Sequence, residues 1–410
     1  MKILIVASID NNPYNGVPRA VPGLVNALQD TLMEQSGDNQ IAFVNVRSIM
    51  IDGIDCQIVP SKYSLDEMQT EFKRPDLVIF HEVYYPAFIR LGNDCKKYGI
   101  PYIIIPHGCL TKEALEIKKW KKRLGNELLF KKFVMGAEAL QFLSPSEKRK
   151  TIFKKDGFVG LNGVSDRGEA YSTASLLVSS PAETDIQRSC VSSNKPYTVY
   201  TYIGRMDMHI KGLDLLVKAV AETQKVLREN LCIFKLYGPD CYDSKRKFTL
   251  LAEELGVGDL IEINGPVEEE KKEEVLLNTD IFIQTSRSEA LPMGLLEALS
   301  YGIPCLVSKG TGLAGLINKY DAGWGENISL RINHETNEQT TNNNKKVAPV
   351  DNKDWEEAKV KSLAELIVSS INDKATYHQK SENAQQLIKE HFEIKKCTER
   401  LLIKYRSYIR

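Results

Sequence analysis

The sequence lacks a hydrophobic run long enough to span a membrane, and it lacks an excess of charge of either sign. Lys and Arg together number 54, as do Asp and Glu, so the formal net charge is zero. A general attraction to nucleic acid is therefore not expected. The apolar run at residues 3–7 meets a polar loop by Asp10 and lacks the basic start and cleavage site of a secretion signal. We expect this run to form the first strand.

The cysteines also lack a pattern. None of the eight forms a Cys-x-x-Cys pair, which disfavours both a zinc knuckle and a disulfide framework. Reduced thiols in the cytoplasm are expected instead. The sequence has no Asp-x-Asp cluster in a metal-binding context either, and no metal site is predicted.

Length and composition indicate two soluble domains. A chain of 410 residues with 42% apolar and 26% charged residues exceeds the size at which one core keeps growing. Short β-branched runs alternate with polar stretches of helical period, which predicts α/β domains with buried parallel strands and helical crossovers. The expected strands are residues 3–7, 42–46, 77–80, 102–105, 198–203, 231–237, 260–263, 281–284 and 304–307. The expected helices are residues 18–34, 87–98, 212–228, 245–255, 271–278 and 293–300.

The domain boundary is expected near residue 164. Residues 1–164 then form an N-terminal domain and residues 165–392 a C-terminal one, with a Ser- and Thr-rich loop or insertion at residues 165–196. A second polar stretch, at residues 333–352, is expected to be a surface loop. A last helix in residues 393–410 is expected to close the chain, with packing back on the N-terminal domain as one option.

Two cations mark the first loop of the second half. Arg205 and Lys211 stand between the expected strand at residues 198–203 and the expected helix at residues 212–228. Ligands of doubly wound sheets bind beyond the carboxyl ends of the strands. We therefore expect both cations where a diphosphate is neutralised, with two solvated surface charges as the alternative.

Two carboxylates mark a second loop and helix. Glu289 is expected in the loop and Glu297 on the following helix, whose first N–H groups, at Gly294 and Leu295, are predicted to bind phosphate oxygens. Glu297 is placed to accept hydrogen bonds from the hydroxyls of a ribose. Glu289 is placed to bind a sugar or to stabilise positive charge at its anomeric carbon. The alternative is a helix-dipole acid and an ordinary surface Glu.

Together these motifs resemble family 4 glycosyltransferases, a large retaining family. The resemblance rests on Gly204-Arg205, on Lys-Gly-x-Asp-x-Leu from Lys211, and on Ser-x-x-Glu-Ala-Leu-Pro-x-x-Leu-Leu-Glu-Ala ending in Gly-x-Pro. It implies the GT-B fold, in which two Rossmann-like, doubly wound domains face each other across a cleft. It also implies that Arg205 and Lys211 bind the donor diphosphate, Glu297 the ribose and Glu289 the transferred sugar.

The resemblance implies further donor contacts. Gly238 and Pro266 end neighbouring strands and would flank the base, although such residues are also common in plain turns. Ala290 departs from the glycine that the family commonly has, which leaves the fit near the sugar open. The turn implied to wrap the phosphates and the sugar consists of Leu291, Pro292, Met293, Gly294 and Leu295.

The N-terminal half is expected to serve the acceptor. Gly16 precedes a helix begun near Pro18, and a glycine there lets the backbone approach a phosphate or an acceptor. The family's glycine loop and its similar His-Gly pair imply that Gly16 lies across from the donor and that His107 lies next to the reacting sugar. Arg19 is a further candidate. His81, which also follows a strand, is interpreted as structural.

A basic stretch at residues 112–135 carries several Lys and Arg residues beside Trp120 and an apolar run. A helix of this kind can lie on an anionic membrane surface, which would suit a lipid-linked acceptor and a peripheral place on the inner face of the plasma membrane. An exposed charged helix of a soluble protein is the alternative. Nucleic acid is not expected as a partner, because no stacking module or base-reading motif accompanies the charges.

The expected activity is therefore that of a metal-independent hexosyl- or related transferase of class EC 2.4. Its co-substrate is a nucleotide-diphosphate sugar, UDP- or GDP-linked, and no bound cofactor is expected. The acceptor is a glycan or a lipid-linked oligosaccharide of bacterial capsule, exopolysaccharide or other surface-polysaccharide synthesis. The expected catalytic residues are His107, Glu289, Arg205 and Lys211.

The expected mechanism is attack on the front face of the sugar, assisted by the leaving phosphate, whose charge the cations and helix amides stabilise. Two other classes stay open. A GT-B nucleotide-sugar epimerase would bind the same donor, and a catalytically silent partner subunit would use the fold only for binding.

Overall fold

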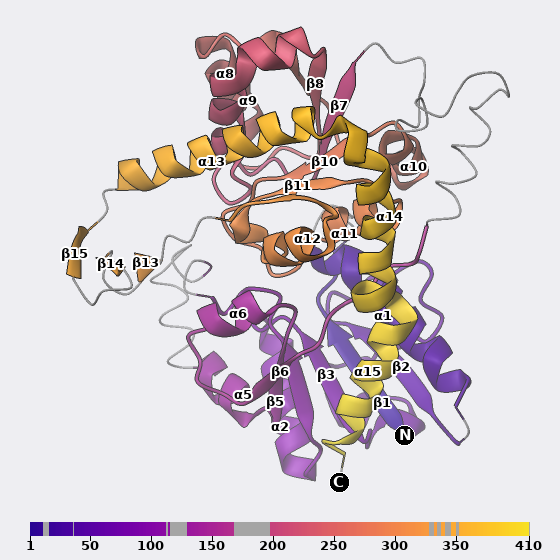
Figure 1. Cartoon of the computed structure of the whole chain (residues 1–410). Coiled ribbons are helices and arrows are strands. Elements are labelled where there is room, and N and C mark those ends of the chain that lie inside the picture. Colours follow the sequence, from indigo (N-terminus) through magenta and orange to yellow (C-terminus); the bar gives the residue numbers. More distant parts are fainter. Residues whose placement is uncertain are drawn as a thin grey trace, which may run out of the picture. The chain divides into compact units, whose positions relative to one another are not determined.

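The computed structural model describes residues 1–10, 16–35, 37–111, 114, 129–167, 197–327, 332–333, 338–340, 346–349 and 352–409. Contacts divide the chain into two compact units (Figure 1). Unit 1 comprises Met1–Ser165, Glu289–Met293 and Glu390–Arg410. Unit 2 comprises Asp166–Ser288 and Gly294–Lys389.

Unit 1 is built on a six-stranded sheet in the order β2-β1-β3-β4-β5-β6, and all of its neighbouring strands run parallel. The strands are β1 Lys2–Ala7, β2 Gln40–Asn45, β3 Leu77–His81, β4 Tyr102–Ile105, β5 Ala139–Phe142 and β6 Gly157–Val159. Successive residues of the central strands are buried, so both faces of the sheet are covered. The helices are α1 Gly16–Met33, α2 Pro86–Tyr98, α5 Lys131–Gly136, α6 Pro145–Lys150 and α15 Ile394–Arg406, with 3₁₀ turns at Leu65–Glu67 and Thr70–Phe72.

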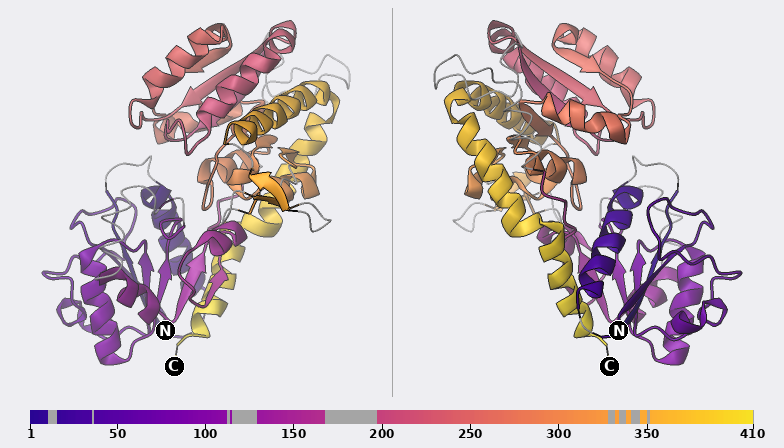
Figure 2. Two further views of the ribbon diagram at one scale, coloured as in Figure 1. Left: turned by 90° about the vertical axis from the view of Figure 1, so that its left-hand side faces the viewer. Right: turned by 90° about the vertical axis from the view of Figure 1, so that its right-hand side faces the viewer.

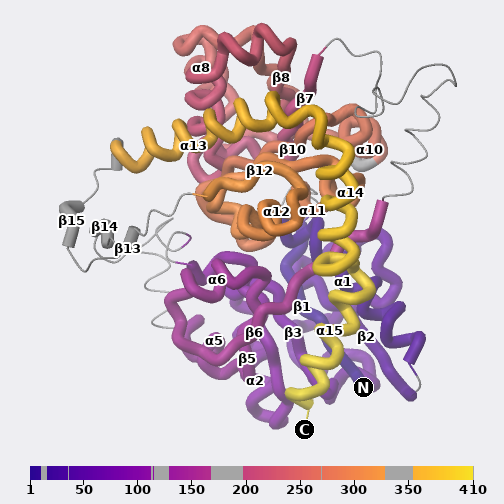
Figure 3. The backbone as a smooth tube through the Cα atoms, in the orientation of Figure 1, coloured from indigo at the N-terminus to yellow at the C-terminus, as the bar shows by residue number. Residues whose placement is uncertain are grey.

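The C-terminal helix α15 belongs to unit 1, where it lies along α1 (Figure 3). The buried hydroxyls of Thr31 and Thr398 are 2.8 Å apart, which joins the two helices. Tyr405 donates a buried hydrogen bond of 2.7 Å to Gln141 Oε1 on β5. Because buried polar groups need partners, these bonds fix the position of α15 on the sheet.

Unit 2 is built on a second six-stranded parallel sheet, in the order β12-β11-β10-β7-β8-β9. The strands are β7 Thr198–Ile203, β8 Cys232–Tyr237, β9 Ile261–Ile263, β10 Ile281–Gln284, β11 Cys305–Val307 and β12 Gly323–Gly325. The helices are α8 Leu213–Glu229, α9 Ser244–Glu254, α10 Glu269–Leu277, α11 Met293–Ser300, α12 Ala314–Tyr320, α13 Asn352–Asn372 and α14 Tyr377–Leu387. Short 3₁₀ turns occupy Gly258–Leu260, Lys309–Thr311 and Lys374–Thr376, and a π-helical turn at Ile388–Phe392 leads into α15.

Helices cover both faces of each sheet (Figure 2). In unit 2, α8 and α13 pack closely against each other, and their buried residues share one core with the strands. Such a doubly wound sheet gathers the loops that follow its strands at one edge. The loops that carry Arg205, Lys211, Gly238 and Pro266 lie at that edge.

The predicted α/β class and GT-B fold are confirmed by these two parallel sheets and by the structural comparison below. The strands and helices expected from periodicity are present within a few residues of their predicted bounds. β5, β6, β12, α6, α12, α13 and α14 were not predicted. The expected loop at residues 333–352 is wrong in part, because short strands β13 Ile332–Asn333, β14 Glu338–Thr340 and β15 Lys346–Pro349 form an antiparallel sheet there.

Some predictions fall outside the described residues. These are most of the loop at residues 165–196 and, within the stretch 112–135, residues 112–113 and 115–128 with most of its basic side chains. Within the described part of the chain, no helix is both long enough and apolar enough to cross a membrane.

Candidate functional site

Three loops stack at the carboxyl edge of the unit 2 sheet. Gly204 N, after β7, donates to Tyr237 O at 2.9 Å, and Gly238 N, after β8, donates to Gly265 O at 3.1 Å. Gly238 has a φ of 157°, and a Cβ there would lie 1.7 Å from Gly204 O. Only glycine permits this approach of two main chains. The loops that carry Arg205, Gly238 and Pro266 are thereby held side by side.

The backbone of the Lys211 loop is held by hydrogen bonds to the side chains of Asp207 and Thr285. Asp207 is buried, and its Oδ1 accepts a hydrogen bond of 2.9 Å from Ile210 N. Gly212 begins α8 with a φ of 63°, and a Cβ there would lie 2.2 Å from Thr285 O. Thr285 Oγ1 lies 3.1 Å from the carbonyl oxygens of Lys211 and Gly212. Lys211 therefore sits on a tight turn held against the end of β10.

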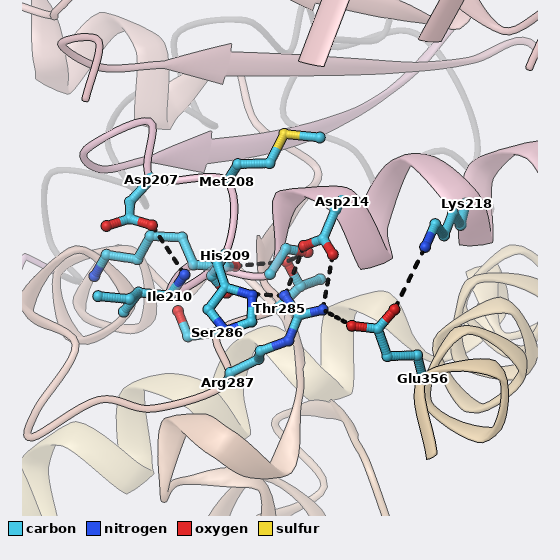
Figure 4. Close-up of polar contacts among 12 residues, drawn as sticks. Asp207, Met208, His209, Ile210, Asp214, Lys218, Thr285, Ser286, Arg287 and Glu356 are labelled. Atoms are coloured by element: carbon cyan, nitrogen blue, oxygen red, sulfur yellow. Dashed lines mark hydrogen bonds and ion pairs between the residues drawn. The ribbon is translucent and has the colours of Figure 1, made fainter. Parts of the chain in front are cut away.

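Arg287 is the centre of this support (Figure 4). Its guanidinium donates to both carboxylate oxygens of Asp214 at 2.6 and 2.7 Å, and to His209 O at 2.8 Å. A further bond of 3.1 Å joins it to Glu356 on α13. The side chain is about one-tenth exposed, so these bonds are shielded from solvent.

The charge of Arg287 is held by this network. Burial alone would lower the pKa of the guanidinium, but the hydrogen bonds and charges of Asp214 and Glu356 raise it on balance. Lys218 of α8 also pairs with Glu356, at 3.6 Å. The network ties the Lys211 loop, α8 and α13 together, and a planar bidentate pair of this kind gives geometric precision as well as attraction.

The N-terminus of α11 lies at the end of β7. A Cβ on Gly294 would lie 3.0 Å from Ile203 O, so the small residue allows the close approach. The helix buries Leu295 and Leu296 in the core. The first N–H groups of a helix have no intrahelical partner and attract anions. Gly294 and Leu295 thus lie close to the end of β7, which leads into the loop of Arg205, and their phosphate contact stays a prediction.

Glu297, one turn into α11, is paired with Lys272 on α10. Lys272 Nζ lies 2.8 Å from Glu297 Oε2, and the two side chains are 9% and 21% exposed. Lysine is seldom buried without a partner. Lys272 could not be predicted from the sequence, because Lys271, Lys272, Glu273 and Glu274 together have the pattern of an ordinary charged helix face.

The remaining predicted residues lie in unit 1. Gly16 opens α1, and a Cβ there would have no atom within 4 Å, so the packing of the protein does not itself require glycine. The segment Glu289–Met293 is grouped with unit 1 by its contacts, and Glu289 is half-buried within it. Arg19 lies on α1, half-buried.

His107 occupies a tight turn after β4. Cys109 N donates to Pro106 O at 3.1 Å, and His107 and Gly108 have φ values of 51° and 79°. Positive φ at both central residues is the pattern of a type I′ turn. For a histidine this conformation costs about 1 kcal/mol or more and persists where surrounding structure enforces it, often at functional sites.

Glu147 helps to hold the turn of His107 in this conformation. It lies at the start of α6, is buried, and accepts hydrogen bonds from Gly108 N at 2.5 Å and from Leu143 N at 2.7 Å. Burial raises the pKa of its carboxyl group, against the two backbone bonds that lower it. The carboxyl group thus holds the turn of His107 to the neighbouring helix.

A second polar cluster lies at the same edge of the unit 1 sheet. Glu82 follows β3 with a φ of 76°. Burial raises the pKa of Glu82 to about 7, although Tyr85 and Arg47 oppose the shift. Arg47 Nε donates to the buried hydroxyl of Ser8 at 2.9 Å. This cluster could not be predicted from the sequence, since its members come from three separate loops.

Across residues that the structure describes, no group of three or more His, Cys, Asp or Glu side chains is arranged to hold a metal ion.

Comparisons with known proteins relate this chain to glycosyltransferases. Residues 183–326 match the family described as Glycosyl transferases group 1. The UDP-N-acetylglucosamine–peptide N-acetylglucosaminyltransferase GtfA subunit of Streptococcus parasanguinis is 32% identical over 96 residues, 23% of this chain and 18% of the relative. The lipopolysaccharide glucosyltransferase WaaG of Escherichia coli (strain K12) is 30% identical over 117 residues, 28% of this chain and 30% of the relative.

The matched segments thus span less than a third of either relative's length. In structure, Anabaena Alr3699/HepE in complex with UDP-glucose is similar with a TM-score of 0.61 at 14% identity, over 99% of this chain and 100% of that one. A likeness at this identity shows the fold.

The fold of the chain and its segment at residues 183–326 are similar to those of GT-B glycosyltransferases, in agreement with the resemblance found in the sequence.

Proposed function

We propose that the protein is a retaining glycosyltransferase that binds a nucleotide-diphosphate sugar at the carboxyl edge of the unit 2 sheet. The observation that carries this proposal is the fixed loop of Lys211, which Asp207, Thr285 and Arg287 hold in place. The loop follows β7, whose end also meets the N-terminus of α11 through Gly294. Preorganised cations and helix amides stabilise the charge that develops on a leaving diphosphate.

The donor is assigned to residues of this edge by their chemistry. Arg205 and Lys211 neutralise the diphosphate, and the N–H groups of Gly294 and Leu295 bind its oxygens. Glu297 accepts hydrogen bonds from the ribose hydroxyls, in an orientation that Lys272 supports. Further contacts are proposed from the family resemblance: Gly238 and Pro266 at the base, and Glu289, Leu291, Pro292 and Met293 at the sugar and phosphates.

The reaction is proposed to retain the anomeric configuration. The bond between the anomeric carbon and the phosphate oxygen breaks, and the acceptor oxygen bonds to that carbon on the same face. The acceptor's proton goes to an oxygen of the leaving phosphate. No metal ion is needed for the leaving group, because Arg205 and Lys211 supply its counter-charge.

Unit 1 is proposed to carry the acceptor, with Gly16 at the acceptor or phosphate and His107 at the reacting sugar. The acceptor is a glycan or a lipid-linked oligosaccharide of bacterial surface-polysaccharide synthesis, a context supported by the lipopolysaccharide glucosyltransferase among the relatives. A cytoplasmic place on the inner face of the plasma membrane follows from that context and from the basic stretch at residues 112–135.

A UDP-sugar is the proposed donor, supported by the UDP-glucose complex of the structurally similar HepE. The test is a thermal-shift panel of UDP-, GDP-, ADP- and dTDP-sugars without added metal. Stabilisation by a ligand follows its affinity for the folded state. UDP-sugars are expected to raise the unfolding temperature of the wild type and not of Lys211→Ala. The exposed Lys225 on α8 offers a matched control, Lys225→Ala, which is expected to respond like the wild type.

The alternatives give different results in the same assays. A donor that is altered at one sugar carbon without any acceptor indicates an epimerase. Absence of a shift with every nucleotide sugar at millimolar concentration indicates a silent partner subunit. Transfer with inversion, seen in the product's anomeric proton coupling, contradicts the retaining mechanism.

A further inference from the structure

A second histidine lies against His107. His81 ends β3 and is fully buried, and its Nδ1 lies 2.9 Å from His107 Nε2. The ring centroids are 5.2 Å apart with planes inclined by 31°. The contact follows from topology, because β3 and β4 are parallel neighbours and His81 pairs in register with Ile105, two residues before His107.

The contact requires a shared proton. Two ring nitrogens at this distance are in repulsion unless one of them carries a hydrogen and donates it to the other. Burial lowers the pKa of His107 to about 4, and burial and the neighbouring ring lower the pKa of His81 well below its ordinary value. Near neutral pH each ring is therefore neutral and carries one N–H.

Only two arrangements satisfy these conditions. If His107 donates from Nε2, the proton of His81 must lie on its own Nε2. If His81 donates from Nδ1, the proton of His107 must lie on Nδ1. The first arrangement puts both protons on Nε2, and the second puts both on Nδ1.

The surroundings of His81 distinguish the two. His81 Nε2 is buried and has no hydrogen-bond partner among the described residues. A buried N–H without an acceptor is rarer in proteins than an unpaired acceptor. The second arrangement leaves only an unprotonated lone pair at this position, so it is favoured.

We propose that His81 is a positioning residue that donates from Nδ1 to His107 Nε2 and holds His107 as the Nδ1–H tautomer. His107, which is only partly exposed in its turn, then offers a neutral hydrogen-bond donor at Nδ1. Its partner in a complex is an oxygen acceptor, which we assign to a hydroxyl oxygen of the transferred sugar; this last assignment rests on the proposed function. His107 in this state is not a base for the acceptor's proton, in agreement with proton transfer to the leaving phosphate.

The first experiment reads the tautomers directly, without substrate. Ring ¹⁵N spectra of histidine-labelled wild type at neutral pH distinguish protonated Nδ1 from protonated Nε2, and the six histidines are assigned with His107→Asn and His81→Asn. Both rings of the pair are expected to be protonated on Nδ1. Protonation of both on Nε2 overturns the proposal, whatever the activity of the enzyme.

The second experiment reads the consequence for transfer. His81→Phe removes the donor, and kcat is expected to fall about tenfold, the size of one hydrogen bond, with the KM of the donor sugar little changed. His81→Asn places an amide N–H near the former Nδ1 and is expected to recover much of kcat. Equal loss in both variants, or a loss confined to folding stability, shows a merely structural role.

Failure of the proposed function can be distinguished from failure of the proposal on His81. If no nucleotide sugar binds or reacts, the proposed function fails while the tautomer measurement still decides the role of His81. Retained stabilisation of each variant by the donor serves as the folding control, and the wild-type spectrum decides even if His81→Phe does not fold.

Discussion

Lys272 Nζ and Glu297 Oε2 form a 2.8 Å ion pair between α10 and α11, and the lysine side chain is only 9% exposed. An isolated buried ammonium is costly, so the carboxylate makes the burial of Lys272 possible. In return the ammonium fixes the orientation of the Glu297 carboxylate, which we propose binds the ribose. The pair therefore connects the packing of α10 with donor affinity.

Lys272→Met is expected to weaken donor binding about tenfold, because Glu297 loses the contact that orients it. Titration of UDP against the variant by calorimetry measures the effect. The neighbouring Lys271 is 72% exposed, so Lys271→Met removes the same charge from a solvated position and is expected to bind like the wild type. If both variants lost the same affinity relative to the wild type, Lys272 would act only through the net charge of the helix.

Arg287→Lys tests the support of the Lys211 loop. Lysine keeps the charge but cannot make the bidentate bond to Asp214 together with the bond to His209 O. The free energy of unfolding is expected to fall by about 1–3 kcal/mol, and donor affinity is expected to fall with it. Chemical denaturation with and without UDP measures both.

Arg228→Lys is the matched control for that change. Arg228 makes a similar two-pronged contact with Asp259, but both side chains are largely exposed. Surface pairs contribute little, so this variant is expected to keep wild-type stability within about 0.5 kcal/mol. Similar losses in the two variants would contradict the role given to burial around Arg287.

The sequence predicted the sheets better than the network that supports the site. Buried parallel strands are continuous apolar runs, and these are visible in the printed sequence. β12 was missed because two of the three residues in its Gly-Trp-Gly text are glycines, which are depleted in strands. It pairs in parallel with β11, and Gly323 approaches β11 so closely that a Cβ would lie 2.1 Å from Cys305 O.

Ion-pair partners that are far apart in the sequence were also not predicted. Arg287 stands in the motif between Ser286 and Glu289, yet its partners Asp214 and Glu356 are 73 and 69 residues away. Nothing in local spacing pairs such residues, since only the sheet topology brings their loops together. Asp214 was within the Lys-Gly-x-Asp motif, but its role became evident only from the contact.

Gly238→Ala tests the stacking of the loops after β7 and β8. The added Cβ would lie 1.7 Å from Gly204 O, a main-chain atom, so the two loops must separate. A loss of about 3 kcal/mol in the free energy of unfolding and of measurable UDP binding is expected. At Gly258 a Cβ meets no atom within 4 Å, and Gly258→Ala is expected to change stability by no more than about 0.5 kcal/mol. Intact UDP binding in Gly238→Ala would show that the loops are not part of the donor site.

Glu82 is expected to make the stability of unit 1 depend on pH. Its pKa is raised from 4.5 to about 7, chiefly by burial, so the folded state binds the proton more tightly than the unfolded chain does. The favourable contribution of the protonated form is therefore complete below about pH 4.5 and is lost as the pH rises to about 7.

Glu82→Gln removes this titration while keeping a neutral polar side chain beside Tyr85. The variant is expected to match the wild type near pH 4.5 and to be more stable above pH 7 by up to about 3 kcal/mol, since one pKa unit is worth about 1.4 kcal/mol. Denaturant titrations across this range measure the difference, with Glu71→Gln, at an exposed position, as the control. A constant difference between Glu82→Gln and the wild type across the range would show that Glu82 is already ionised in the folded state, and the polar cluster of Arg47, Ser8 and Tyr85 would then have to stabilise a buried carboxylate.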